Sequence, residues 1–247
     1  MSLRQTPPPP STTTPPYAKG RPALALGRCV VLEIGDSLGN DLGWGLAREI
    51  GAQRGLVLVQ HDLSSSGLTT PWFYDWPQHF AQYLHQYRPH LVVITFGAND
   101  EQGMRVHGSA VAFGTPQWRD EYLRLLRQMI GEATKRGAYV LWVGLPVMEP
   151  NGYRQGVQYL NALYQEVATS VPGATYLSTW RLLANARGQY QSAAYANHVS
   201  SVLRASDGIH LSYVGEEVLA TYVAREMASI YHVVITPVAP VVLTPRG

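Results

Sequence analysis

The chain alternates between short apolar runs and longer amphipathic segments. Five runs are continuously apolar, and they cover residues 29–34, 56–60, 91–96, 138–144 and 174–178. A strand that is buried on both faces of a parallel sheet needs continuous apolarity, whereas a half-exposed strand alternates. The pattern therefore predicts five parallel strands.

The segments between these runs have the spacing of helices. In the clearest one, Thr115 and Pro116 suit the N-cap and the first helical position, and Gly137 suits the end. We expect further helices over residues 40–55, 155–171 and 212–231. Strands that alternate with helices of this length predict right-handed crossovers and an α/β fold, a three-layer α/β/α sandwich.

Length and charge narrow the class of protein. A chain of 247 residues with 46% hydrophobic residues suits a single α/β domain. The 19 basic and 17 acidic residues give a net charge of +2 without runs of like charge, which argues against nucleic acid or an anionic membrane surface as the main partner. No segment approaches about 18 consecutive apolar residues, so we expect no membrane span.

Both ends of the chain differ from the middle. Residues 1–22 are rich in Pro and Thr, as in an extended linker, and we expect a folded domain over 23–235 and a Pro-containing tail over 236–247. We expect such a linker to follow an export signal or membrane anchor that precedes this sequence, which favours an extracytoplasmic protein. The alternative is a cytoplasmic protein with an unstructured tail. The single Cys29 lies in an apolar run and is expected to be buried and inert.

Residues that suit ester chemistry follow three of the predicted strands. Ser37 follows the first strand and opens a helix, where the backbone N–H groups favour developing negative charge. Gly67 follows the second strand and allows a close backbone approach. Asn99, in "GAND" after the third strand, is a neutral donor to an oxyanion. The carboxyl ends of parallel strands form the ligand-binding edge of such a sheet.

Far along the chain, Asp207 lies three residues before His210, at the entrance to the last predicted helix. In this spacing a carboxylate can hold one imidazole nitrogen while the other faces a serine, which is the arrangement that activates a serine nucleophile. For Ser37 alone, the simpler interpretation is a helix N-cap. The combination with Asn99, Asp207 and His210 favours the nucleophile.

Together these four blocks resemble the SGNH, or GDSL-type, serine hydrolase superfamily, in an extracytoplasmic bacterial subgroup. The blocks are Gly35-Asp36-Ser37-Leu38, Gly67 in "SSSGLTT", Asn99 in "GAND", and Asp207 with His210 in "DGIH". The resemblance spans roughly residues 29–232. It implies a flavodoxin-like parallel sheet of about five strands in the order 2-1-3-4-5.

The resemblance also implies roles for these residues. Ser37 would be the nucleophile, His210 the general base and acid, and Asp207 the residue that orients His210. The oxyanion hole would consist of the Ser37 and Gly67 backbone N–H groups and the Asn99 side chain. The implied reaction is hydrolysis of a short-chain acyl ester, by analogy an O-acetyl group on cell-envelope carbohydrate, without cofactor or metal.

Three alternatives remain at this point. Gly35 to Gly39 also spells G-x-S-x-G, the nucleophile elbow of α/β-hydrolases, but Ser37 follows the first strand and no HGGG-like loop precedes it. An O-acyltransferase could use the same triad with a sugar hydroxyl as acceptor. A non-catalytic module with this fold could bind envelope glycans.

Other residues are weaker candidates. Aromatic rings near the first two blocks and residues after the fourth strand could form the substrate wall, and so could a histidine in the glycine-containing insertion after Asn99. We expect Asp36 to support the turn and Asp100 to be a loop or cap hydrogen bonder. No histidine pair has metal-ligand spacing. The candidate substrate-wall residues are Trp44, Trp72, His107, Met148 and Tyr153.

Overall fold

A computed structural model describes residues 29–149, 153–196 and 199–233. The predicted linker (1–22) and tail (236–247) lie outside the described residues, so both stay predictions. None of the helices in these ranges is both long and apolar enough to cross a membrane.

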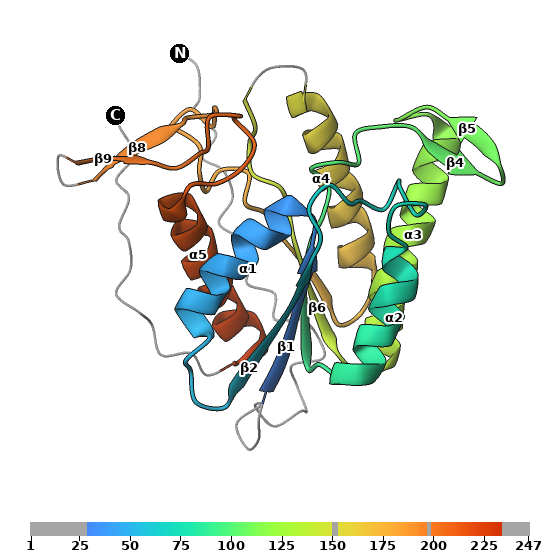
Figure 1. Ribbon diagram of the computed structural model, residues 1–247, viewed down its shortest axis with the longest axis horizontal. Helices are drawn as coiled ribbons and strands as arrows, with labels where there is room; N and C mark the ends of the chain where they lie inside the picture. Colours follow the sequence, from blue (N-terminus) through green and yellow to red (C-terminus); the bar gives the residue numbers. More distant parts are fainter. Residues whose placement is uncertain (1–28, 150–152, 197–198, 234–247) are drawn as a thin grey trace, which may run out of the picture.

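A five-stranded, entirely parallel sheet forms the centre of the molecule (Figure 1). Its order is β2-β1-β3-β6-β7. Because β4 and β5 form a separate hairpin, β6 and β7 are the fourth and fifth strands of this sheet, and the predicted order 2-1-3-4-5 is confirmed. All five predicted strands are present, with bounds that differ by one or two residues. They are β1 (Cys29–Gly35), β2 (Leu56–Asp62), β3 (Leu91–Thr95), β6 (Tyr139–Val143) and β7 (Ala174–Leu177).

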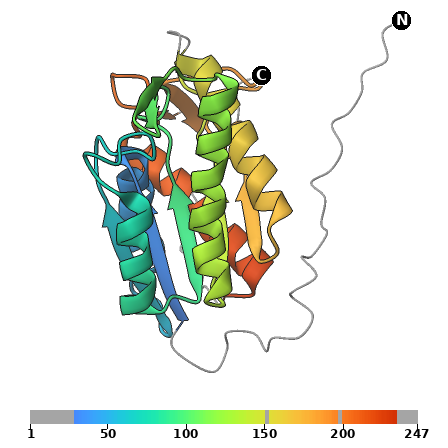
Figure 2. The same ribbon diagram turned by 90° about the vertical axis from the view of Figure 1, so that its right-hand side faces the viewer.

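Helices cover both faces of the sheet, which confirms the three-layer sandwich. On one face lie α1 (Ser37–Ile50) and α5 (Tyr213–Tyr231), packed against each other (Figure 1). Figure 2 shows the helices of the opposite face side by side. These are α2 (Trp76–Tyr87), α3 (Pro116–Lys135) and α4 (Tyr153–Ser170).

The two helical layers explain why the strands are continuously apolar. In β1, Val31 belongs to the hydrophobic cluster beneath α1 and α5, while Leu32 and Ile34 belong to the cluster beneath the other three helices. All three side chains are completely buried. Cys29 is also buried and free, as predicted.

Helix α1 differs from its predicted bounds. It begins at Ser37 because the Asp36 side chain accepts the Leu38 N–H and caps the helix. It ends at Ile50, so the predicted end at Gly55 was wrong: Gly55 lies in the following turn, with φ +83°. Thr115 caps α3 as predicted, and its side chain accepts the Trp118 N–H.

Two short antiparallel hairpins were not predicted as strands. The first pairs β4 (Met104–Val106) with β5 (Ser109–Val111) in the insertion between β3 and α3. The second pairs β8 (Ala193–Ala196) with β9 (Val199–Val202) ahead of α5. Figure 1 shows both hairpins at the same end of the molecule as the start of α1.

Candidate active site

Ser37 lies where β1 passes into α1, at the carboxyl end of the sheet. It is the first residue of the helix, and Asp36 rather than Ser37 is the N-cap. The N-cap interpretation of Ser37 was therefore wrong. A side chain on Gly35 would collide with the Thr95 carbonyl and with Gly39, so glycine allows the helix to start this close to β3.

The loop before α5 brings His210 and Asp207 to Ser37. The Ser37 Oγ lies 2.8 Å from His210 Nε2, and His210 Nδ1 lies 2.6 Å from Asp207 Oδ2. The other Asp207 oxygen accepts the backbone N–H groups of Ile209 and His210, at 2.8 and 3.0 Å. The structure therefore joins the three predicted residues in one hydrogen-bonded chain, across 173 positions of sequence.

The surroundings of Asp207 favour its ionised form. Partial desolvation raises the pKa of this carboxyl, but the hydrogen bonds from the His210 ring and from two backbone N–H groups outweigh it and lower the pKa to about 2. The carboxylate is thus charged throughout the neutral range. It can hold the imidazole with the proton on Nδ1, which leaves Nε2 free to accept the proton of Ser37.

The Asp36 carboxylate ties the end of β1 to the loop after β3. Besides capping α1, it accepts the backbone N–H groups of Gly97 and Ala98, at 2.9 and 2.8 Å. Asp36 is completely buried. Burial raises its pKa to about 7, against the three N–H bonds, which lower it. This confirms the prediction that Asp36 is structural.

Asp100 makes the corresponding connection between the loops after β3 and β2. Its carboxylate accepts the backbone N–H and the hydroxyl of Thr69, at 3.0 and 2.9 Å, and the hydroxyl of Tyr122, at 2.7 Å. A Cβ on Gly67 would collide with this carboxylate, so glycine is needed at that position. Asp100 is therefore a loop hydrogen bonder, one of the two roles predicted for it.

The donors predicted for an oxyanion hole lie on these fixed loops. Within the described ranges, no acceptor is hydrogen-bonded to the Ser37 or Gly67 backbone N–H. The Asn99 side chain donates one amide hydrogen to the Ser66 carbonyl, at 2.9 Å. Its second amide hydrogen is thereby left for a ligand. Each of the three predicted donors thus keeps an N–H group for a ligand, as an oxyanion hole requires.

Two residues that the sequence analysis missed hold the histidine loop. On α1, one turn after Ser37, Asp41 accepts the backbone N–H of Leu211, at 2.8 Å. The buried Arg204 guanidinium donates to the carbonyls of Ile209 and Val147. The contacts of Asp41 with Leu211 and of Arg204 with Val147 join segments that are distant in sequence, so no local pattern could have indicated them.

A buried glutamate and a half-buried aspartate lie together beneath α1, close to the site. Glu33 of β1 and Asp62 at the end of β2 are adjacent, and a side chain on Gly43 would meet both carboxyls. Burial and the neighbouring Asp62 raise the pKa of Glu33, and burial raises that of Asp62 to about 7. The residues that the structure describes contain no cluster of His, Cys, Asp or Glu suited to a metal ion.

The predicted substrate-wall residues lie in different places, and one of them lines a cavity. Trp72 lines a cavity of about 600 Å³ between the loop after β2 and the β4–β5 hairpin. Trp44 is exposed on α1, and His107 lies at the hairpin turn, near Glu121. Neither of these two lines that cavity. The side chain of Tyr153 lies outside what the structure describes.

Met148 does not form a substrate wall, so that prediction was wrong. Its side chain is completely buried, and its sulfur lies 3.8 Å from a nitrogen of Arg204. The segment after β6 turns inward, whereas the strand-end rule had placed it at the exposed edge.

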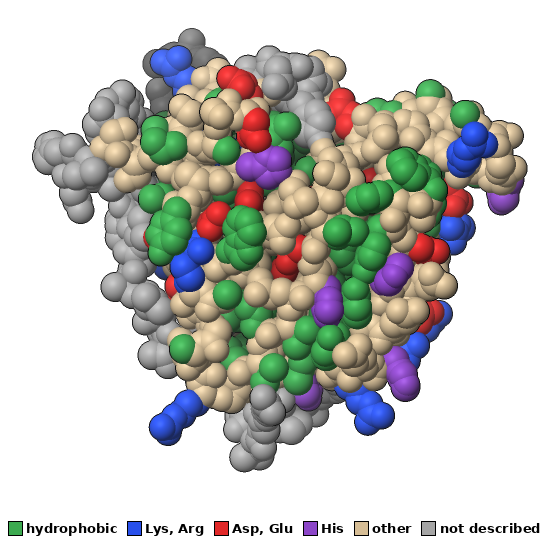
Figure 3. Space-filling model, viewed as in Figure 1, with side chains coloured by type: hydrophobic (Ala, Val, Ile, Leu, Met, Phe, Trp, Pro, Cys, Tyr) green, Lys and Arg blue, Asp and Glu red, His purple; other side chains and the backbone are tan. Residues whose placement is uncertain are grey.

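Large hydrophobic side chains are exposed on α1, on the loop after β2, on β9 and at the start of α5. Figure 3 shows hydrophobic side chains grouped over α1 and near the β4–β5 hairpin, while Lys and Arg are dispersed. The most exposed large ones are Trp44, Trp72, Phe73, Val202 and Tyr213. Exposed rings of this kind suit a ligand with an apolar face.

The parallel sheet of order 2-1-3-4-5, with a Ser, a Gly, an Asn and an Asp-x-x-His at its carboxyl end, defines the SGNH hydrolase fold. Residues 30–226 match a family described as "Protein of unknown function (DUF459)", and the chain belongs to that family. No curated protein matches the sequence.

Solved structures agree with this fold at low sequence identity. An acetylxylan esterase from Geobacillus stearothermophilus is 16% identical, with a TM-score of 0.57 over 81% of this chain and 94% of its own. A GDSL-like lipase from Bacteroides thetaiotaomicron is 15% identical, with 0.52 over 81% and 87%. An enzyme described as an α/β hydrolase, from the metagenome of Lake Arreo in Spain, is 16% identical, with 0.58 over 85% and 98%.

Proposed function

We propose that this protein is a serine esterase that removes short acyl groups, O-acetyl groups in particular, from carbohydrate of the cell envelope. The observation that carries the proposal is the chain from Ser37 Oγ to His210 Nε2 and from Nδ1 to Asp207, with both distances below 3 Å. Esterases and a lipase among the solved structures of this fold support the reaction class.

The proposed reaction has two stages. Ser37 Oγ attacks the ester carbonyl carbon and gives its proton to His210 Nε2, which passes it to the leaving alcohol as the C–O bond breaks. Water then attacks the acyl-enzyme, with His210 again taking the proton and returning it to Ser37. Asp207 keeps the ring oriented and stabilises its positive charge.

The oxyanion would be bound by the Ser37 and Gly67 backbone N–H groups and by Asn99. Such donors act only where charge develops, so they lower the barrier more than they strengthen substrate binding. Replacement of Asn99 by Ala should remove about 3 kcal/mol of transition-state stabilisation, which is about 100-fold in kcat.

Covalent labelling tests the nucleophile. A fluorophosphonate probe should label the wild-type protein at Ser37, as located by peptide mass spectrometry. Ser37→Ala should abolish labelling, and His210→Ala should reduce it strongly, because the hydroxyl then lacks a base. A wild-type protein that is folded but resists the probe would reject the esterase and favour the non-catalytic glycan-binding alternative.

Substrate and product analysis test the rest of the proposal. With p-nitrophenyl esters, acetate should be turned over better than octanoate, and a preference for octanoate would indicate a lipase-like role instead. With an acetylated glycan, free acetate in solution supports hydrolysis. Acetyl transfer to an added sugar would establish the O-acyltransferase alternative.

Location is part of the proposal because an envelope substrate requires it. The Pro/Thr-rich residues 1–22 are of the kind that separates a domain from an export signal or anchor. Fractionation of the source cells should recover the protein outside the cytoplasm. Recovery in the cytoplasm alone would contradict an envelope substrate.

A further inference from the structure

The cavity beside the hairpin is joined to the predicted oxyanion hole by direct hydrogen bonds. Of its lining residues, Thr70 donates to the Gly67 carbonyl, at 3.4 Å, and the Gln102 amide donates to the Asn99 carbonyl. The cavity volume of about 600 Å³ suits one or two sugar rings. Whatever fills it therefore lies against the loops that carry Gly67 and Asn99, two of the residues predicted to bind the oxyanion.

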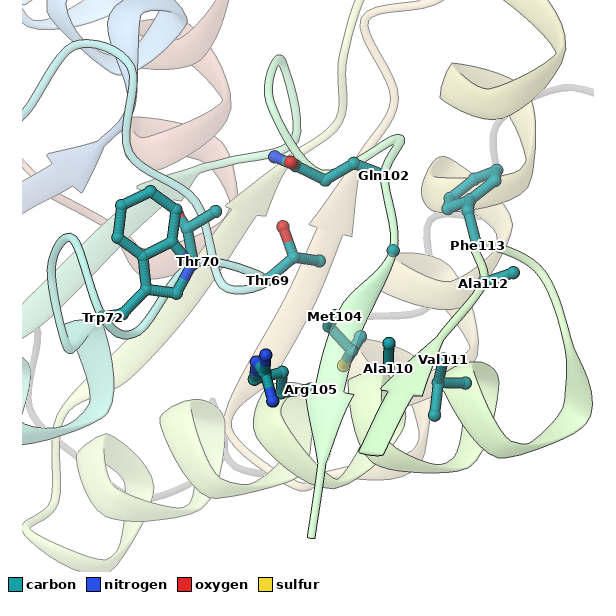
Figure 4. Close-up of a pocket in the computed structure, with 11 residues that line it drawn as sticks. Thr69, Thr70, Trp72, Gln102, Met104, Arg105, Ala110, Val111, Ala112 and Phe113 are labelled. Atoms are coloured by element: carbon teal, nitrogen blue, oxygen red, sulfur yellow. The ribbon is translucent and has the colours of Figure 1, made fainter. Parts of the chain in front are cut away.

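Trp72 supplies a flat apolar surface at this cavity. Its side chain is 79% exposed, the largest value among the exposed large hydrophobic residues that the structure describes. Figure 4 shows its indole ring on one side of the cavity, across from the hairpin residues Ala110 and Val111. A ligand with an apolar C–H face, such as a pyranose ring, can stack on this exposed indole and remove its apolar surface from water.

Arg105 supplies a positive charge to the same cavity. Its guanidinium donates to the Gly108 carbonyl within the hairpin turn, at 2.9 Å, and none of the ion pairs formed by the described residues includes it. The nearby Arg124 is paired with Glu121. The unpaired guanidinium thus leaves a net positive charge at the cavity, with donors that suit a carboxylate.

We propose that this cavity binds a carboxylate-bearing sugar, a uronic-acid-type pyranose, next to the ester-bearing unit. Trp72 stacks on the ring and Arg105 pairs with the carboxylate. This rests on the proposed function, and it makes the substrate an acylated acidic glycan rather than a neutral one. A long acyl chain is disfavoured, because such a chain needs an enclosed apolar channel, whereas Arg105 and Gln102 border this one.

Binding to inactive protein tests the cavity independently of catalysis. Ser37→Ala protein should bind trigalacturonic acid at least tenfold more tightly than xylotriose, by calorimetry. Adding Arg105→Gln should remove that difference, while Arg119→Gln, an arginine of α3 paired with Glu166, should preserve it. Adding Trp72→Ala should weaken both sugars and Trp72→Phe should restore part of the affinity, as stacking requires.

Kinetics on two natural-type substrates complete the test. The ratio of kcat/KM for acetylated oligogalacturonides to that for acetylated xylooligosaccharides should fall about tenfold in Arg105→Gln and should not change in Arg119→Gln. An unchanged ratio in Arg105→Gln would overturn the proposal, and so would equal affinity of the inactive protein for the two trisaccharides. If Trp72→Ala lowered kcat/KM only for long-chain esters, the cavity would be an acyl pocket and the proposal would also be overturned.

The two proposals fail in different ways. Absence of fluorophosphonate labelling and of ester turnover rejects the esterase, but the calorimetric difference between the two trisaccharides still tests the cavity. Normal labelling and turnover with equal affinities rejects the acidic-glycan site alone.

Discussion

Two aspartates of the site, Asp36 and Asp207, each accept backbone N–H groups, yet their pKa values move in opposite directions. Asp36 is fully buried and its pKa rises to about 7, while the partly exposed Asp207 has a pKa of about 2. The difference follows from solvent: the hydrogen bonds lower both values, but only for Asp36 does desolvation exceed them. One carboxyl holds the scaffold together, and the other keeps a charge beside His210.

Asp36→Ala is expected to have the largest effect, on stability. Three buried N–H groups, of Leu38, Gly97 and Ala98, lose their acceptor, at about 1–3 kcal/mol each. The sum approaches the whole stability of a domain, about 5–15 kcal/mol. Thermal unfolding checks this, with Asp36→Asn, which keeps one acceptor oxygen, as the milder companion. A melting temperature of Asp36→Ala equal to that of the wild type would show that the Asp36 carboxyl does not stabilise the fold.

Asp207→Asn should affect activity rather than folding. The amide cannot supply the charge that stabilises the protonated ring, and it favours the wrong tautomer, so kcat should fall about 10³–10⁴-fold. Ester turnover and circular dichroism measured on the same sample separate the two effects. If the melting temperature of Asp207→Asn fell as far as that of Asp36→Ala, the two aspartates would not differ in their structural role.

Asp41→Ala should give an intermediate loss of activity. Without the Asp41 carboxylate, the Leu211 N–H loses the acceptor that ties the histidine loop to α1, so His210 is less precisely placed. We expect a fall of about tenfold in kcat with little change in KM, and partial recovery in Asp41→Asn. Equal defects in the two variants would show that the charge of Asp41, rather than its hydrogen bond, matters.

The pH dependence of stability should be the smallest effect. The folded-state pKa of Asp62 is about 7, well above about 3.9 in an unfolded chain, so the native state binds more protons between these values. Its stabilising contribution is present below about pH 4 and is lost as pH rises through 7. We expect the melting temperature to be about 5 °C lower at pH 8 than at pH 5, and this slope to shrink in Asp62→Asn.

The contribution of Asp207 to stability depends on pH in the opposite direction. Its folded-state pKa is below the unfolded value, so its contribution is present above about pH 4 and is lost as pH falls towards 2. Asp207→Asn should leave the difference between pH 5 and pH 8 intact. If Asp207→Asn reduced the difference in melting temperature between pH 5 and pH 8 as much as Asp62→Asn, the assignment of that difference to Asp62 would be wrong.

The sequence predicts the sheet well because burial on both faces produces a local signal. The inner strands β1, β3 and β6 are almost fully buried, and the half-buried edge strand β2 still begins with four apolar residues. The position of each strand fixes which residues reach the carboxyl edge. Ser37 and Asn99 could be found in this way, and the Asp-x-x-His spacing indicated Asp207 and His210. Asp41 and Arg204 could not be found, because Leu211 and Val147, with which they form hydrogen bonds, lie far along the chain. Hairpin strands of three residues, such as Met104–Val106, are too short to show a period.

The β4–β5 hairpin lies in the connection between β3 and α3, apart from the elements that carry Ser37 and His210. It supplies one wall of the cavity but no member of the hydrogen-bonded chain at the serine. Under the proposed function, changes in this segment should therefore alter which substrate is accepted without disturbing the chain from Ser37 to His210 and Asp207. For protein engineering, the hairpin is the segment to exchange when a new specificity is wanted from an unchanged reaction centre.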